Sequence, residues 1–267
     1  MTTRLIFGLT LMLARCAASH GADQPKPLIH AHAHNDYEHT RPLFDALDHG
    51  FCSVEADIYL VNGQLLVAHD RKDLKPDRTL QALYLDPLKK RVIGNRGRIY
   101  RNGPTICLLI DFKTNGEEMW PVLRGILNSY SDILTSFEGD AVRTNAITVI
   151  LTGGRPEKMV AAEPVRLAAL DGKFIDLAAN HPATLMPWIS EQWTKFFQWQ
   201  GIGPMPEDEK KKLAGYVSQV HQQGMQLRFW GAPDIELVWR ELRRAGVDWI
   251  NSDKLAGLEK FFLEAEK

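Results

Sequence analysis

The segment Cys52-Ser-Val-Glu-Ala-Asp-Ile-Tyr59 combines apolar and β-branched residues with two acids that stand two positions apart. This composition is typical of a β-strand, in which alternate side chains face the same side. Glu55 and Asp57 are therefore expected to project together from one face. Two unneutralised acids on a half-buried strand would be costly, so the pattern predicts a hard cation held by oxygen ligands. Mg²⁺ or Ca²⁺ meets this requirement.

Strands and helices alternate on both sides of this segment. We predict strands over residues 27–34, 51–59, 64–68, 104–113, 146–151, 174–178, 225–230 and 247–251, and helices over 40–49, capped by Thr40, 117–130 and 235–245. Such alternation predicts an α/β protein with a parallel sheet, and the number of units predicts a (β/α)₈ barrel of the TIM type in a single domain over residues 27–263. An open doubly wound sheet is the alternative, but the Gly-rich turn typical of that fold does not follow the first strand.

The polar residues of this chain gather where the predicted strands end. In (β/α)₈ barrels the working side chains lie at the carboxyl ends of the strands, and these positions hold His34, Asp57, Asp111, Lys113 and Asn251. Asp111 and Lys113 repeat on another strand the spacing of Glu55 and Asp57. Asp111 is therefore a third predicted metal ligand, and Lys113 is a cation that could stabilise a negatively charged transition state.

Histidines near the same strand ends could carry protons. Cleavage of a phosphodiester needs a base for the attacking oxygen and an acid for the leaving oxygen, and imidazoles with a pKa of about 6.5 can serve as both. His69 follows the predicted hairpin turn Asn62-Gly63 and is one candidate. His32 and His34 share one strand face, so either could be the second, and His34 is favoured because it is nearer the strand end.

Two residues of a late strand are predicted to contact the substrate. Arg228 and Trp230 alternate on the strand over 225–230, so one strand face would place both at the mouth of the barrel. Together with Lys113 and Asn251 they form the predicted substrate-binding set. A further aromatic stretch contains Trp193 and Phe197 at helical spacing, which predicts a core-facing helix rather than a lipid-facing lid.

Five segments of the chain resemble the glycerophosphodiester phosphodiesterase superfamily, whose barrel is of the phospholipase C-like phosphodiesterase type. They are His34-Asn-Asp-Tyr37, Ser53-Val-Glu-Ala-Asp57, Leu66-Val-Ala-His-Asp70, Ile110-Asp-Phe-Lys113 and Gly246-Val-Asp-Trp-Ile-Asn-Ser-Asp253. The first three are similar to the branch named for altered inheritance of mitochondria protein six. The resemblance implies a divalent metal at Glu55, Asp57 and Asp111, two catalytic histidines, and a small-molecule or lipid phosphodiester as substrate.

The chain departs from the superfamily pattern after its first strand. Glycerophosphodiesterases usually carry His-Arg-Gly where this chain has His34-Asn-Asp36, so a phosphate-binding arginine is missing. Lys113, Arg228 or Lys72 would have to replace it. Sphingomyelinase D proteins are also similar and share an aspartate at the position of Asp111, which leaves transphosphatidylation as an alternative to hydrolysis.

Two other functions compete with a metal-dependent phosphodiester hydrolase. The pair His32-Ala-His34 on the first strand is the way that metal hydrolases of the polymerase-and-histidinol-phosphatase and amidohydrolase types begin, although these enzymes need further histidines at later strand ends. The other is an exported phosphate-binding protein without turnover. The formal net charge of −1 gives no reason to expect nucleic acid as a partner.

The first 22 residues are predicted to be a signal peptide. A positively charged start at Arg4 precedes an apolar run over residues 5–14, and small residues follow it as cleavage sites. The run is too short to span a bilayer, so no transmembrane segment is expected in the mature chain. Arg15 stands where a lipoprotein signal requires a small residue, so export to the periplasm or the outside is favoured over lipid anchoring at Cys16.

Overall fold

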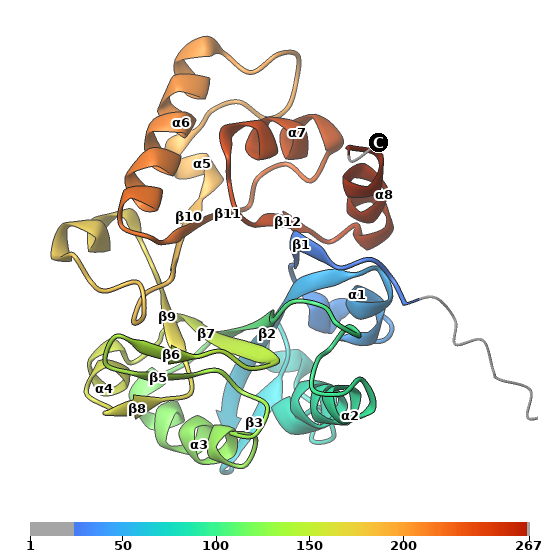
Figure 1. The fold of residues 1–267 in the computed structure, drawn as a ribbon, viewed down its shortest axis with the longest axis vertical. Coiled ribbons are helices and arrows are strands. Elements are labelled where there is room, and N and C mark those ends of the chain that lie inside the picture. The colour runs from blue at the N-terminus through green and yellow to red at the C-terminus, as the bar shows by residue number, and fades with distance from the viewer. Residues whose placement is uncertain (1–23, 266–267) are drawn as a thin grey trace, which may run out of the picture.

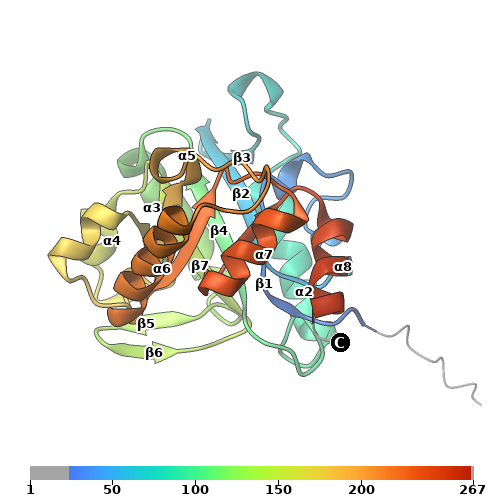
Figure 2. The same cartoon turned by 90° about the horizontal axis from the view of Figure 1, so that it is seen from above.

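The structure, a computed structural model, describes residues 24–265. The predicted signal peptide over residues 1–22, including Cys16, lies outside the described residues. Within them, eight parallel strands form a nearly closed barrel surrounded by helices (Figures 1 and 2). The predicted fold class is thereby confirmed.

The barrel strands follow one another around the ring in chain order. They are β1 (Leu28–Ala33), β2 (Phe51–Val61), β4 (Ile106–Phe112), β7 (Ile147–Gly153), β9 (Ala169–Gly172), β10 (Trp188–Gln192), β11 (Gln226–Trp230) and β12 (Ile250–Ser252). β12 pairs with β1, and a parallel bridge between Arg228 and Trp249 joins β11 to the segment that leads into β12. This bridge brings the late strands next to the first one.

Helices cover the outside of the barrel, and small strands extend it. The helices are α1 (Phe44–Asp48), α2 (Asp86–Gly94), α3 (Gly116–Asn128), α4 (Glu157–Ala161), α5 (Trp193–Phe196), α6 (Glu207–Gln222), α7 (Glu236–Ala245) and α8 (Leu255–Ala265), with short turns η1 (Asp36–Glu38), η2 (Arg71–Asp73), η3 (Gln81–Leu85) and η4 (Phe174–Ala179). β3 (Gln64–Val67) pairs with β2, and β5 (Ser136–Glu138), β6 (Ala141–Arg143) and β8 (Val165–Arg166) form a separate small sheet. No helix in residues 24–265 combines the length and the hydropathy needed to cross a bilayer.

The half of the barrel interior that lies toward the amino ends of the strands, called the lower half below, is apolar. Trp188 and Trp249 lie with their ring centroids 4.7 Å apart and pack with Leu109, Phe137, Ile150 and Ala169. His32 touches the edge of Trp188 from above, at a centroid distance of 6.1 Å. Because apolar side chains fill the lower interior, the polar residues that point inward gather at the carboxyl end of the strands.

The strand predicted over residues 174–178 is wrong. That segment is the 3₁₀ turn η4, and the barrel strand β9 ends two residues before it. The carboxylate of Asp176 accepts the backbone N–H of Lys173 at 2.8 Å, which starts the turn immediately after the strand. With only four residues, β9 is too short to show the periodic pattern by which strands are predicted.

Two predicted helices also differ in extent. The helix predicted over residues 40–49 is confined to α1, because Leu43 adopts a left-handed φ of 66° and donates its backbone N–H to Asp36 at 2.5 Å. Thr40 therefore does not cap it. The helix predicted around Trp193 begins only at that residue, after strand β10, but the packing of Trp193 and Phe197 in the core is confirmed.

We expect Trp188→Ala to lower the free energy of unfolding by about 3–5 kcal/mol, because it empties the centre of the barrel floor. Chemical denaturation monitored by circular dichroism would measure the change. Ile202→Ala is the control, since Ile202 is 87% exposed and should change stability by no more than about 0.5 kcal/mol. Equal effects of the two substitutions would contradict the proposed role of Trp188.

Candidate active site

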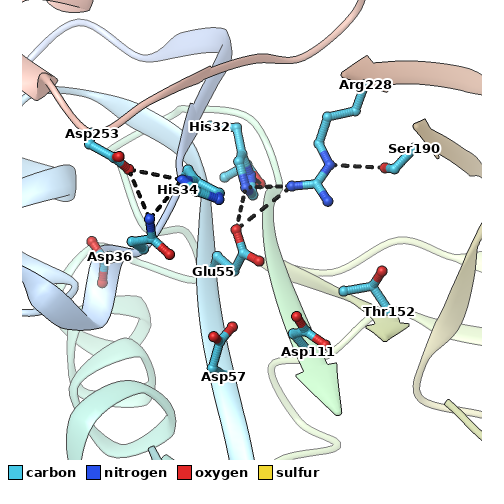
Figure 3. Close-up of polar contacts among 12 residues, drawn as sticks. His32, His34, Asp36, Glu55, Asp57, Asp111, Thr152, Ser190, Arg228 and Asp253 are labelled. Atoms are coloured by element: carbon cyan, nitrogen blue, oxygen red, sulfur yellow. Dashed lines mark hydrogen bonds and ion pairs between the residues drawn. The ribbon is translucent and has the colours of Figure 1, made fainter. Parts of the chain in front are cut away.

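Three carboxylates meet at the carboxyl end of the barrel. Glu55 and Asp57 point inward from β2, and Asp111, the register partner of Asp57, points inward from β4 (Figure 3). One oxygen from each lies within 4.8 Å of the others. Glu55 and Asp57 are buried, whereas the side chain of Asp111 is 18% exposed. The strand register therefore assembles the acids that the sequence pattern predicted to lie together.

Lys113 partly neutralises this cluster. Its Nζ lies 2.7 Å from Oδ2 of Asp57 and 2.8 Å from Oδ2 of Asp111. Burial would lower the pKa of Lys113, but the charges of Asp111 and Asp57 outweigh it and raise that pKa. Burial, together with the charges of Glu55 and Asp111, raises the pKa of Asp57 to about 7. The single ammonium of Lys113 thus does not neutralise the three carboxylates fully.

The cluster fits the divalent cation that the superfamily resemblance implies. Oδ1 of Asp57 is buried and has no hydrogen-bond partner, so one oxygen is free for a ligand. Carboxylate oxygens are the donors that Mg²⁺ and Ca²⁺ prefer. A bound cation would also relieve the mutual repulsion that raises the pKa of Asp57. Glu55, Asp57 and Asp111 are therefore suited to hold such an ion.

Glu55 is held from below by a buried network. Nε2 of His32 lies 3.2 Å from Oε2 of Glu55, and Nη1 of Arg228 lies 3.7 Å from the same oxygen. Burial alone would raise the pKa of Glu55, but the His32 hydrogen bond and the Arg228 charge lower it. Arg228 also donates from Nε to Oγ of Ser190 at 2.9 Å. Glu55 is consequently kept ionised and fixed in direction.

His32 and His34 occupy different depths of the barrel. His32 is fully buried, with Nδ1 2.7 Å from Oγ of Ser53 and Nε2 facing Glu55 and Arg228. Burial lowers the pKa of His32 to about 4, so its imidazole is neutral at pH 7. With both ring nitrogens engaged below the cavity, His32 is placed to orient Glu55 rather than to reach a substrate.

His34 lies at the cavity surface and pairs with an acid. Its Nδ1 is 2.9 Å from Oδ1 of Asp253, and its side chain is 28% exposed. Burial lowers the pKa of His34, but the Asp253 hydrogen bond and the charge of Glu55 raise it by more. Because Asp253 engages Nδ1, Nε2 remains to exchange a proton. His69, 56% exposed, lines the same cavity from the end of β3.

The cavity above these groups has a volume of about 480 Å³, and most of the residues that line it are charged or polar. It brings together eight of the ten predicted site residues, all except His32 and Asn251, and adds five that were not predicted. The lining residues are His34, Asn35, Glu55, Asp57, His69, Asp111, Lys113, Thr152, Gly153, Lys173, Arg228, Trp230 and Gly231. Asn251 pairs with His32 in the strand register, and both polar atoms of its carboxamide are buried without a partner.

Several residues around the site escaped sequence reasoning. The Tyr37 hydroxyl donates to Oδ2 of Asp57 at 2.6 Å, and Thr152 donates to Oδ2 of Asp171 at 2.9 Å. Asp253 stands two positions after Asn251. Because residues two apart on a strand share a face, the same alternation continued beyond Asn251 would have predicted Asp253 as a site residue. Lys173 follows β9, which was misplaced, so no sequence signal pointed to it.

A family model described as an AIM6-like phosphodiesterase domain matches residues 24–169, which is more than half of the chain. The chain belongs to the AIM6-like phosphodiesterase family. A model of the glycerophosphoryl diester phosphodiesterase family also matches residues 226–256. The first match covers β1 to β8 and ends at the first residue of β9, and the second covers β11 and β12. The three carboxylates therefore lie in the first match, and Arg228 lies in the second.

Curated relatives carry the same family name. Altered inheritance of mitochondria protein 6 of Eremothecium gossypii is 30% identical over 88% of this chain and 69% of its own length. The homolog from Arthroderma benhamiae is 28% identical over 88% of this chain and 84% of its own. These relatives confirm that this chain belongs to the AIM6-like family.

Solved structures share the fold at low sequence identity. A glycerophosphodiester phosphodiesterase from Parabacteroides distasonis is 13% identical, with a TM-score of 0.55, and the match covers 91% of this chain and all of that one. One from Agrobacterium tumefaciens is 15% identical, with a TM-score of 0.50, over 88% of this chain and all of that one. These likenesses support the barrel fold.

We expect Asp111→Asn to weaken binding of a divalent cation by roughly tenfold or more, because it removes one charged ligand of three. Titration with Mn²⁺ followed by electron paramagnetic resonance would measure the affinity. Asp132→Asn serves as the control, since Asp132 is exposed and pairs with Lys89. Unchanged Mn²⁺ affinity in Asp111→Asn would remove Asp111 from the predicted ligands.

We expect Asp253→Asn to lower the pKa of His34, because the carboxylate that stabilises the imidazolium loses its charge. The unsubstituted protein should therefore hold the His34 proton to a higher pH than the variant does. NMR titration of the imidazole C–H resonance would follow this. The His221 resonance is the internal reference, since His221 pairs with Asp248 instead and should be the same in both proteins.

Proposed function

We propose that this chain is a divalent-metal-dependent phosphodiester hydrolase. The observation that carries the proposal is the convergence of three carboxylates, two cavity-lining histidines and several cations in one cavity at the carboxyl end of the barrel. This is the face on which (β/α)₈ barrels perform their chemistry. Membership of a phosphodiesterase family supports the same reaction class.

In this proposal Glu55, Asp57 and Asp111 hold the metal ion. The ion, when bound, supplies Lewis-acid stabilisation of the charge that develops on the phosphoryl oxygens. Lys113 offsets the repulsion between Asp57 and Asp111 and adds positive charge at the same edge of the cavity. His32 and Arg228 fix the carboxylate of Glu55 from below, so that it meets the ion in one orientation.

The two cavity-lining histidines carry the protons. His34, oriented by Asp253, exchanges a proton at Nε2 on the β1 side of the cavity. His69 does so from the end of β3 and, because it is more than half exposed, can pass its proton to water. In-line displacement needs one such group for the attacking oxygen and one for the leaving oxygen. His34 is the strand-one histidine of this proposal, because His32 has no free nitrogen facing the cavity.

The lining of the cavity indicates the part of the substrate that enters it. Trp230 is half-buried there and offers an aromatic face, whereas charged and polar side chains make up most of the remaining lining. A polar phosphodiester group with small alcohol substituents, as in a glycerophosphodiester or the head group of a lysophospholipid, fits this lining. In this proposal Asn251, the register partner of His32, contributes a carboxamide whose polar atoms have no partner.

The rival metal hydrolase with a histidine cluster gains no support from the geometry. Among the described residues, the group of side chains that could hold a metal consists of carboxylates. His32 and His34 do not converge on a common ligand position, because one is buried beneath Glu55 and the other pairs with Asp253. A non-catalytic phosphate-binding protein is instead an outcome of the activity test.

We expect the purified protein to cleave bis(p-nitrophenyl) phosphate or a glycerophosphodiester in the presence of Mg²⁺, and EDTA to abolish the cleavage. His34→Ala and His69→Ala should each lower kcat about 10²- to 10⁴-fold, because each removes a proton-transfer group. Release of p-nitrophenol or of the alcohol would be followed spectroscopically.

His221→Ala is the matched control, because His221 lies on α6 and pairs with Asp248. It should leave kcat unchanged. Phosphate binding without turnover of any phosphodiester in a panel would indicate a binding protein instead. Activity that survives both EDTA and His69→Ala would contradict the proposed mechanism.

A further inference from the structure

Three cationic side chains line the cavity: Lys113, Arg228 and Lys173. An anionic substrate is bound best by a cation whose charge is not already neutralised by the protein, because an existing ion pair must otherwise be weakened. The three cations differ sharply in this respect. A cation that is not neutralised could also replace the arginine that glycerophosphodiesterases usually carry after the first strand, which this chain lacks.

Lys113 and Arg228 already have acidic partners. Lys113 contacts two carboxylates at 2.7 and 2.8 Å. Arg228 is buried, donates to Ser190, and lies 3.0 Å from Nε2 of His32, 3.7 Å from Glu55 and 3.8 Å from Asp171. Lys72, the third replacement considered from the sequence, is 77% exposed, pairs with Asp70 and does not line the cavity.

Lys173 is held in the cavity wall without an acidic partner. Its Nζ donates to the backbone carbonyl of Ser190 at 2.8 Å. Within the described part of the chain, no carboxylate oxygen pairs with this ammonium at 4.0 Å or less. One carbonyl uses one of the three N–H donors of the ammonium, so two remain.

The acids near Lys173 are engaged by other groups. Glu191 accepts the backbone N–H of Phe174 at 2.8 Å, and Asp176 accepts that of Lys173 itself. Asp171 accepts the Thr152 hydroxyl. Burial lowers the pKa of Lys173, and the charges of Asp171 and Glu191 only partly oppose this. The ammonium is therefore desolvated without close charge compensation, which an incoming anion would supply.

We propose that Lys173 binds a non-bridging oxygen of the substrate phosphoryl group, as the cation that replaces the missing arginine. The inference rests on the proposed function, because it places the phosphoryl group in the same cavity as the carboxylate site. The capping bond between Asp176 and the Lys173 backbone fixes where the side chain leaves β9. The wall of β9 thus supplies the anion-binding charge, while β2 and β4 supply the metal ligands.

Inorganic phosphate is the probe for this role. Isothermal titration calorimetry of the full chain with Mg²⁺ present should show the phosphate Kd rising roughly tenfold or more in Lys173→Met, as expected for loss of a charge-assisted hydrogen bond. Lys173→Arg should recover part of the affinity. Lys195→Met is the matched control, because Lys195 is exposed on α5 and does not line the cavity.

Mn²⁺ affinity should be the same in Lys173→Met and the unsubstituted protein, which separates anion binding from damage to the metal site. Turnover of a phosphodiester by Lys173→Met should show a raised KM. Phosphate binding that depends on Lys173 would support the inference even if no phosphodiester were cleaved. Equal phosphate affinity in Lys173→Met and the unsubstituted protein, or no phosphate binding at all, would overturn it while leaving the hydrolase proposal to its own test.

Discussion

The crowding of three carboxylates at one end of the barrel is the constraint to which the surrounding structure responds. Oxygens of Glu55, Asp57 and Asp111 lie within 4.8 Å of one another, two of the three residues are buried, and such acids repel strongly in a medium of low polarity. Two cations on different strands partly compensate the negative charge of these carboxylates. Lys113 reaches Asp57 and Asp111 from the end of β4, and Arg228 approaches Glu55 from the opposite wall. The residual imbalance raises the pKa of Asp57 and is what a divalent cation would remove.

Closure of the barrel makes this compensation possible. Arg228 lies on β11 and forms the bridge to Trp249, so the charge from a late strand reaches an acid on the second one. Beneath it, Trp188 and Trp249 pack together in an apolar cluster. The apolar floor keeps Arg228, His32 and Ser190 desolvated, which strengthens their hydrogen bonds and fixes Glu55 above them.

Residues of one strand face take different tasks according to their depth. His32 and His34 are two positions apart, about 7 Å along a strand, and share one side. The deeper imidazole is enclosed and neutral, whereas the outer one meets the cavity and pairs with Asp253 from the last strand. The same division separates Asp171, buried against Thr152, from Lys173, whose ammonium reaches the cavity wall. In each case the inner residue is buried in contacts with its neighbours, and the outer residue lines the cavity.

Local periodicity was enough to predict the barrel class, the strand of Glu55 and Asp57, and the shared face of Asp111 and Lys113. These features depend on alternation within single strands, which the sequence records directly. The four-residue strand β9 carries too little periodicity to be located, so Lys173 could not be found from sequence. The pairing of His34 with Asp253 and the approach of Arg228 to Glu55 join residues more than 170 positions apart. Only closure of the ring decides such contacts, because it sets which strands become neighbours and how deep each side chain lies.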